Sequence, residues 1–189
     1  MIEKKLQRGF TLAELLVVMA ALGIVSIAMV GAYLMQAKLT SSEIKLNDAQ
    51  IRVGDVLADL ARTAGQADEI LSTSDIGGVT YLSGPNSVIL SLPAVTASGN
   101  ILSNAYDLIV FFRDDSNNLQ KTVAAASGSK RPSGTKTVFK NAATFVLNYE
   151  DDPSPNLSDW FTAEVSTDVV TNAGSQNVSA KMRITLENK

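Results

Sequence analysis

The sequence predicts an α+β fold in which one long N-terminal helix packs on an antiparallel β-sheet domain. A change of pattern along the 189-residue chain supports this prediction. As far as Gly65, apolar residues recur at helical spacing, whereas beyond it apolar and polar residues alternate in short runs separated by turn residues. The apolar stripe of a helix and the apolar face of a sheet are surfaces that can bury each other.

Residues 10–37 are predicted to form a hydrophobic, membrane-spanning helix. The segment from Leu15 to Met35 has 21 residues and no charge, which is enough to cross about 30 Å of hydrocarbon. The segment also contains small residues that let helices approach closely, namely Gly23, Ser26 and Gly31. Both an ordinary single-pass anchor and a helix that packs against copies of itself fit this pattern.

Residues 38–65 are predicted to continue the same helix with an amphipathic pattern. The apolar positions fall on one stripe, formed by Leu39, Leu46, Ala49, Val53, Val56, Leu57, Leu60 and Ala64. The other face is charged, with Glu43, Lys45, Asp48, Arg52, Asp55, Asp59 and Arg62. Gly65 is predicted to end the helix, and Gly54 is a position where it could bend.

Residues 66–189 are predicted to form a β-rich globular domain. The strand candidates are Val79–Leu82, Val88–Leu92, Leu108–Arg113, Leu119–Ala124, Thr137–Lys140, Thr144–Tyr149, Thr162–Ser166 and Val178–Leu186. The last shows the clearest alternation, with apolar residues at even positions and polar residues at odd ones. Loops rich in turn formers are expected at Asp114–Asn118, Ser127–Gly134 and Glu150–Asn156.

The composition argues against most kinds of catalysis. The chain has no cysteine and no histidine, so it lacks disulfides, thiolate metal ligands and the commonest general base. The formal net charge is −3, and only Lys4, Lys5 and Arg8 form a basic cluster, so no nucleic-acid partner is expected. We predict no catalytic residue, no metal site and no cofactor, and we do not expect an enzyme.

The N-terminal segment "MIEKKLQRG", residues 1–9, is predicted to be a leader peptide, but not a secretory signal peptide. A signal peptide is cut after its apolar region, whereas here a glycine precedes that region. The segment "GFTLAE", Gly9–Glu14, resembles the class III leader of type IV pilins and pseudopilins at each motif position. The resemblance implies that a prepilin peptidase cuts between Gly9 and Phe10 and methylates the new amino group of Phe10.

The same resemblance implies a location and partners. The precursor would be a single-pass protein of the inner membrane, with its globular domain outside the cytoplasm, and would later join other pilin or pseudopilin subunits in a filament. Glu14 would pair with the Phe10 amine of a neighbouring subunit and fix the axial register, because both charges are costly if buried unpaired. In the stored precursor, Glu14 could instead reach the lipid headgroups.

The downstream chain has a weaker resemblance to larger minor pilins. The segments "YDLIVFFRDDSNNLQKTV", "FKNAATFVLNYEDD" and "SAKMRITLE" follow one another as in the W type of type IV pili and the J type of type II secretion systems. Such subunits are expected at the filament tip, where they start assembly, and in few copies. The absence of cysteine also departs from many major pilins, which close a C-terminal loop with a disulfide.

Three features downstream have alternative interpretations. The acidic groups Asp114–Asn118 and Glu150–Asp152 could bind calcium, but neither has the spacing of an EF-hand loop, so solvated loops are favoured. Trp160 and Phe161 could contact a partner, although a strand start packed into the core is favoured. Lys130 and Arg131 are predicted to lie in a solvated turn.

The competing function is a membrane-anchored extracytoplasmic binding or carbohydrate-active domain with a coincidental leader match. That function would need a pocket with convergent polar groups on the sheet domain, and no sequence feature demands one.

Overall fold

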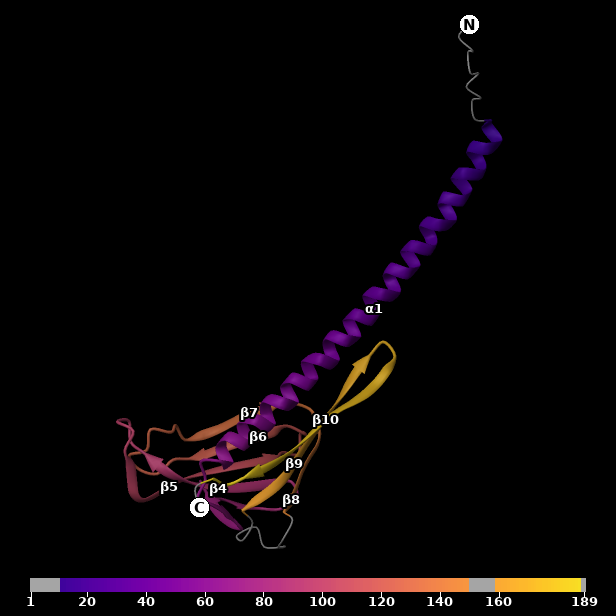
Figure 1. Ribbon diagram of the computed structural model, residues 1–189. Coiled ribbons are helices and arrows are strands. Elements are labelled where there is room, and N and C mark those ends of the chain that lie inside the picture. Colours follow the sequence, from indigo (N-terminus) through magenta and orange to yellow (C-terminus); the bar gives the residue numbers. More distant parts are fainter. Residues whose placement is uncertain (1–10, 150–158, 188–189) are drawn as a thin grey trace. The chain divides into compact units, whose positions relative to one another are not determined.

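A computed structural model describes residues 11–149 and 159–187, and Figure 1 shows the elements in chain order. The predicted α+β class is confirmed, because one long helix, α1 (Leu12–Ala64), is followed by antiparallel strands. The strands are β1 (Glu69–Leu71), β2 (Thr73–Ile76), β3 (Val79–Leu82), β4 (Ser87–Val95), β5 (Ile101–Arg113), β6 (Leu119–Ala124), β7 (Gly134–Phe139), β8 (Ala142–Tyr149), β9 (Trp160–Thr171) and β10 (Gly174–Thr185). The chain divides into two units, residues 1–44 and 45–189, which are described separately below.

The strands of the second unit form three antiparallel sheets. The largest has the order β1-β4-β5-β6-β7, the second the order β10-β9-β8, and the third consists of β2 and β3. Each of the eight predicted strand segments overlaps a strand, and Val79–Leu82 and Leu119–Ala124 have the predicted bounds. Strands β1 and β2 were not predicted, because segments of three and four residues are too short to show alternation of their own.

Three of the predicted strands begin earlier or end later in the structure by several residues. Strand β5 begins at Ile101 rather than Leu108, and this extension pairs with β4 across an irregularity between Pro93 and Val95. Strands β9 and β10 continue to a tight turn, with Thr171 paired to Gly174. Apolar and polar residues do not alternate regularly in these extensions, so pairing with a neighbouring strand determines their length.

The second half of α1 supplies one wall of the hydrophobic core of the second unit. The core cluster includes Val53, Val56, Leu57, Leu60 and Ala64 of the helix. It also includes inward-facing residues of both larger sheets, namely Leu90, Phe111 and Leu119 from one and Phe145, Phe161 and Ile184 from the other. The predicted stripe is therefore correct from Ala49 onward, and burial of its apolar side chains is the main stabilising contribution of this helix.

The beginning of the predicted stripe needs a correction. Leu39 lies in the first unit with its side chain 56% exposed, and Leu46 is only half-buried. At the other end the prediction holds, because α1 ends at Ala64 and the Gly65 N–H makes a closing hydrogen bond of 2.8 Å to the carbonyl of Ala61. The helix runs through Gly54 without a break.

Asp59 was assigned to the charged outer face of the helix, but it is half-buried and ion-paired with β6. The Lys121 ammonium donates to both carboxylate oxygens of Asp59, at 2.9 and 3.1 Å, and to the hydroxyl of Thr63 at 3.1 Å. The same ammonium lies 4.9 Å from the centroid of the Phe111 ring. This contact joins the polar edge of α1 to the large sheet.

The prediction of a solvated turn at Arg131 is wrong. Its guanidinium donates at 2.6 Å to the carboxylate of Asp107 on β5, which is fully buried, and at 2.8 Å to the carbonyl of Pro93. Asp107 also accepts hydrogen bonds from the Ala126 N–H at 2.8 Å and the Ser129 hydroxyl at 2.7 Å. Hydrogen bonds and an ion pair to the buried Asp107 carboxylate thus hold the loop between β6 and β7 in place. Lys130 of the same loop is exposed, as predicted.

The two aromatic residues at the start of β9, Trp160 and Phe161, differ in burial. Phe161 is fully buried beside Tyr149, with ring centroids 5.8 Å apart, as the favoured interpretation predicted. Burial raises the pKa of the Tyr149 hydroxyl well above its usual range. Trp160 is half-buried, and the Arg183 guanidinium covers its ring at 3.6 Å.

Candidate assembly site at the helix N-terminus

Thr11 and Glu14 form a capping box at the start of α1. The Thr11 N–H and hydroxyl both donate to Oε2 of Glu14, at 2.9 and 3.0 Å, and the Glu14 N–H donates to the Thr11 hydroxyl at 3.3 Å. The helix begins at Leu12, so Thr11 is the N-cap residue and Glu14 occupies the third helical position. These bonds satisfy backbone donors that the first turn of a helix leaves unpaired.

The resemblance to pilins implies a partner for Glu14 on another subunit, and the local partner Thr11 was not predicted. The overlooked signal is the spacing T-x-x-E at residues 11–14, which is the sequence form of a capping box. Glu14 therefore has two possible uses, one within its own first turn and one toward a positive charge nearby. Among the described residues both hydrogen bonds end on Oε2, which leaves Oε1 of Glu14 without a donor.

Replacing Thr11 with alanine should loosen the first turn of α1. The N-cap contributes about 1 kcal/mol, so amide hydrogen exchange at Glu14 and Leu15 should become roughly fivefold faster in the full-length protein in detergent micelles. Thr11→Ser keeps a hydroxyl at the cap and should exchange like the unmodified protein. Equal exchange rates in the alanine and serine variants would contradict a capping role.

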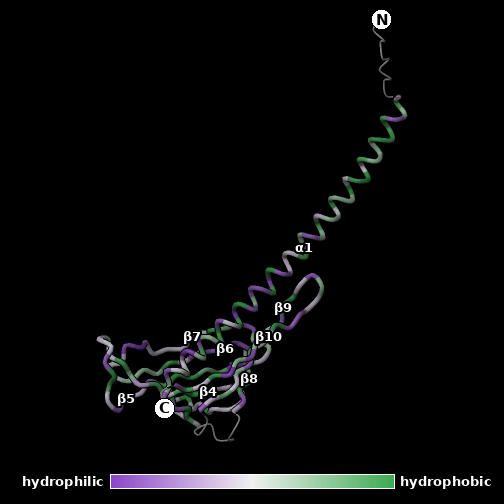
Figure 2. The backbone as a smooth tube through the Cα atoms, viewed as in Figure 1, coloured by the Kyte–Doolittle hydropathy of each residue, from purple (hydrophilic) through white to green (hydrophobic). Residues whose placement is uncertain are grey.

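The helix segment that follows is apolar on every side. The large apolar side chains between Leu12 and Met35 are all at least half exposed within the described residues, and Figure 2 shows the hydrophobic colour over this segment. Its 18-residue window of mean hydropathy 2.6 makes it long and apolar enough to cross a membrane. The hydroxyl of Ser26 donates to the carbonyl of Leu22 at 2.8 Å, so this polar group is satisfied within the helix.

Gly9 and Phe10 lie outside the described residues. The predicted cut between them and the methylation of Phe10 therefore remain predictions. The described part of the motif begins at Thr11. In the sequence, Phe10 directly precedes the N-cap residue Thr11 and stands four positions before Glu14.

The acidic loop at Asp114–Asn118 is the tight β5–β6 connection that the sequence predicted. Asp114 accepts hydrogen bonds from the Asn118 N–H at 2.8 Å and the Gln120 side chain at 2.7 Å, and the bond from Gln120, followed by that from Asn118, lowers the pKa of the Asp114 carboxyl. Its oxygens are thus engaged within the hairpin. No cluster of three or more acidic side chains suited to a metal occurs in residues 11–149 and 159–187, and Glu150–Asp152 lie outside these ranges.

Comparisons with known proteins bear on the N-terminus alone. A family model for the prokaryotic N-terminal methylation motif matches residues 4–30, which include the capping box and much of the apolar helix. No curated protein and no solved structure matched the chain. The motif supports a type IV pilin-like precursor and implies processing by a prepilin peptidase and assembly with other pilins.

Proposed function

We propose that this protein is a minor pilin or pseudopilin, a structural subunit of a type IV pilus or of a type II secretion pseudopilus. The observation that carries the proposal is the methylation motif, matched over residues 4–30, on a helix whose segment Leu15–Met35 is uncharged and whose large apolar side chains there are at least half exposed. An unburied apolar helix of this length needs a covering, which lipid supplies before assembly and the helices of other subunits supply afterwards. No chemical reaction is required of the chain.

In this proposal the precursor spans the inner membrane once, with residues 66–189 outside the cytoplasm. The leader, residues 1–9, is removed, and residues 10–37 then form the part of the helix that enters the filament core. The likeness of the downstream segments to W-type and J-type minor subunits supports a place at the filament tip or in the start of assembly. Filaments would then contain few copies of the chain.

Replacing Gly9 with leucine should block processing of the precursor. A glycine immediately before the cut lets the peptidase approach the backbone closely, and a branched side chain would fill that space. Mass spectrometry of the isolated protein should find methylated Phe10 at the mature terminus of the wild type and an intact Met1 in the variant. A wild-type protein that keeps Met1, or is cut beyond the apolar segment, would refute the proposal and favour a membrane-anchored binding domain.

A further inference from the structure

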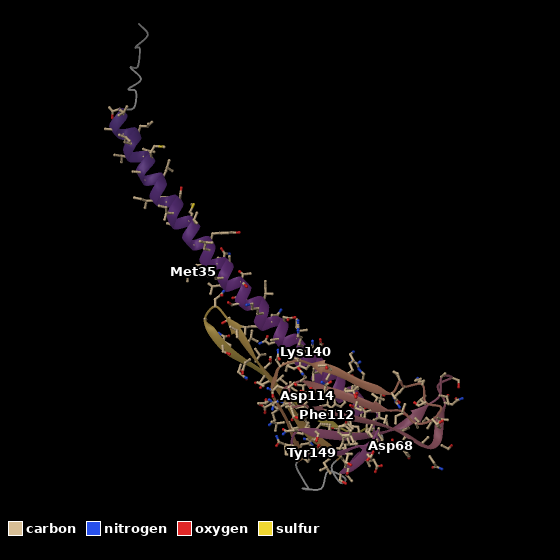
Figure 3. The ribbon with its side chains drawn as sticks, turned by 180° about the vertical axis from the view of Figure 1, so that it is seen from behind. Met35, Asp68, Phe112, Asp114, Lys140 and Tyr149 are labelled. Carbon is tan, nitrogen blue, oxygen red and sulfur yellow. The ribbon has the colours of Figure 1, made fainter. Side chains whose placement is uncertain are left out.

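A cavity of about 400 Å³ opens beside an irregular part of β5 in the second unit. Consecutive residues of this strand, Ile101–Tyr106, line it together with Asp68 and Pro93. Asp68, labelled in Figure 3, directly precedes β1, and Pro93 lies on β4. The volume falls at the lower end of the roughly 300–1,000 Å³ that is typical of small-ligand sites.

The irregular part of β5 is a bulge whose residues border the cavity. Pro93 and Val95 of β4 are two positions apart, yet their partners on β5 are five positions apart. Residues 102–105 therefore have no partner in register on β4, and β6 pairs with β5 only from Leu108 onward. Asn104 has a left-handed backbone conformation, with a φ of 57°, which asparagine adopts more readily than most residues. Bulges are common next to functional sites, where they re-aim side chains.

Contacts outside the cavity hold its borders in place. The guanidinium of Arg131 donates at 2.8 Å to the carbonyl of Pro93 and at 2.6 Å to the buried carboxylate of Asp107 on β5. Leu102 of the bulge lies so close to Gly128 in the β6–β7 loop that a Cβ atom there would be 3.5 Å from its Cδ1 atom. The buried ion pair and this contact give the cavity the fixed surroundings that a binding site needs.

Four polar side chains at the cavity have no hydrogen-bond or ion-pair partner in residues 11–149 and 159–187. They are the carboxylate of Asp68, the hydroxyls of Ser103 and Tyr106, and the amide of Asn104. Tyr106 is also 48% exposed, which leaves its ring accessible beside Pro93. The cavity thus combines an aromatic surface with groups that together both donate and accept hydrogen bonds.

The charges around the cavity do not favour an anionic ligand. In the part of the chain that the structure describes, Asp68 is the only charged residue of the lining, and the neighbouring Glu69 is exposed. The exposed Lys130, whose N–H donates at 2.7 Å to a carbonyl of β4, partly offsets these two carboxylates. Arg131 adds no net charge, because it is paired with Asp107.

Two other cavities of the second unit offer less to a ligand. A groove of about 810 Å³ beside α1 is lined by four carboxylates and four cations, so its charges favour no particular ligand. A cavity of about 250 Å³ near the end of α1 has two of its cations, Lys121 and Arg131, engaged in ion pairs.

We infer that the cavity beside β5 binds a neutral saccharide, which lies on the ring of Tyr106 and shares hydrogen bonds with Asp68 and Asn104. A sugar ring has an apolar C–H face, which suits the negative face of an aromatic ring. Its hydroxyl groups both donate and accept, whereas an ammonium group only donates and would not use the amide N–H groups of Asn104. Binding of a saccharide is a further function of the sheet domain, and it does not depend on processing of the N-terminus.

The test uses the full-length protein in micelles of a detergent that has no sugar headgroup, so that the detergent cannot compete. A microarray of neutral, sialylated and sulfated glycans should show binding to neutral glycans and little binding to the anionic ones. The affinity for the best neutral glycan is then measured by titration. Butylamine, which mimics a lysine side chain, should not displace this glycan at equal concentration.

Variants of the lining separate the ring from the polar groups. Tyr106→Ala and Asp68→Ala should each weaken binding at least tenfold, because they remove the aromatic surface and a charged hydrogen-bond acceptor. Tyr106→Phe keeps the ring and should bind within about threefold of the wild type. The matched controls are Glu69→Ala, beside Asp68, and Leu82→Ala, an exposed apolar residue outside the lining; both should bind like the wild type.

Amide chemical shifts locate the bound glycan. Those of Ile101–Tyr106 should change on titration, whereas those of the β5–β6 hairpin should not. The inference is overturned if no neutral glycan binds, if anionic glycans bind better, or if butylamine displaces the glycan. It is also overturned if Glu69→Ala weakens binding as much as Asp68→Ala, or if the shifts change elsewhere in the domain instead.

Discussion

Glu14→Gln is expected to leave the precursor correctly cut and methylated but to reduce its incorporation into filaments at least tenfold. The glutamine side chain retains an oxygen that can accept the hydrogen bonds from Thr11, so the capping box should persist. The negative charge, however, is lost. The variant therefore separates the capping of the helix by Glu14 from its proposed pairing with the Phe10 amine of a neighbouring subunit.

The size of this effect follows from the cost of an unpaired buried charge. In the proposed filament core, the positive amino group of Phe10 would lie among apolar helices, and removing the partner of such a charge costs roughly 3–5 kcal/mol. Each 1.4 kcal/mol corresponds to a factor of ten in an equilibrium constant. A loss of at least tenfold is thus expected even if solvent or lipid headgroups relieve much of the cost.

The measurement compares the variant in the membrane and sheared-filament fractions of the host cells by immunoblot, with the N-terminus checked by mass spectrometry. Thr11→Ala is the matched control, because it removes the cap and keeps the charge; it should assemble better than Glu14→Gln. If Glu14→Gln entered filaments at the wild-type level, charge pairing in assembly would be disproved. If Thr11→Ala failed to enter filaments while Glu14→Gln entered them normally, the role of this site in assembly would be assigned to the helix cap rather than to the charge.

Asp107→Ala is expected to lower the free energy of unfolding of the globular domain by about 3–5 kcal/mol, the largest effect we expect from any single side chain there. The change removes the fully buried carboxylate, so the Ala126 N–H and the Ser129 hydroxyl lose their acceptor and the Arg131 guanidinium loses its ion-pair partner and keeps the carbonyl of Pro93. Groups that lose their partner in the interior incur the whole cost of desolvation.

Urea unfolding of the full-length protein in micelles, followed by Trp160 fluorescence, measures this loss. Asp168→Ala is the matched control, since this exposed carboxylate accepts one hydrogen bond, from Asn177 at 2.8 Å, and its removal should change stability by about 0.5 kcal/mol or less. The double variant Asp107→Leu/Arg131→Met should recover much of the loss, because an apolar pair can replace a buried ion pair. A change below 1 kcal/mol for Asp107→Ala would contradict the role assigned to this cluster.

The local sequence was enough to predict the features set by short-range periodicity. Helical spacing predicted both ends of α1 to within a few residues, and each of the eight predicted strand segments overlaps a strand of the structure. The tight connection between β5 and β6 followed from a run of turn residues at Asp114–Asn118. The T-x-x-E cap was equally present in the sequence, although it was overlooked because Glu14 already had an expected partner.

Other features depended on groups that are far apart in the chain. Strands β1 and β2 exist because β4 and β3 pair with them, and the long ends of β9 and β10 extend one another. The stripe of α1 is buried only from Ala49 onward, where the sheets provide apolar surface. Leu39 is equally apolar, yet it is 56% exposed.

The N-terminal motif, the membrane-length helix and the fold class were therefore determined by the sequence alone, since each depends on residues within a few turns of one another. The tertiary structure alone decided which charges are buried. Asp107 and Arg131 lie 24 positions apart, and neither has a neighbour in sequence that marks it as special. Whether a carboxylate is solvated or enclosed depends on which distant segment folds over it, and this is a property of packing rather than of local pattern.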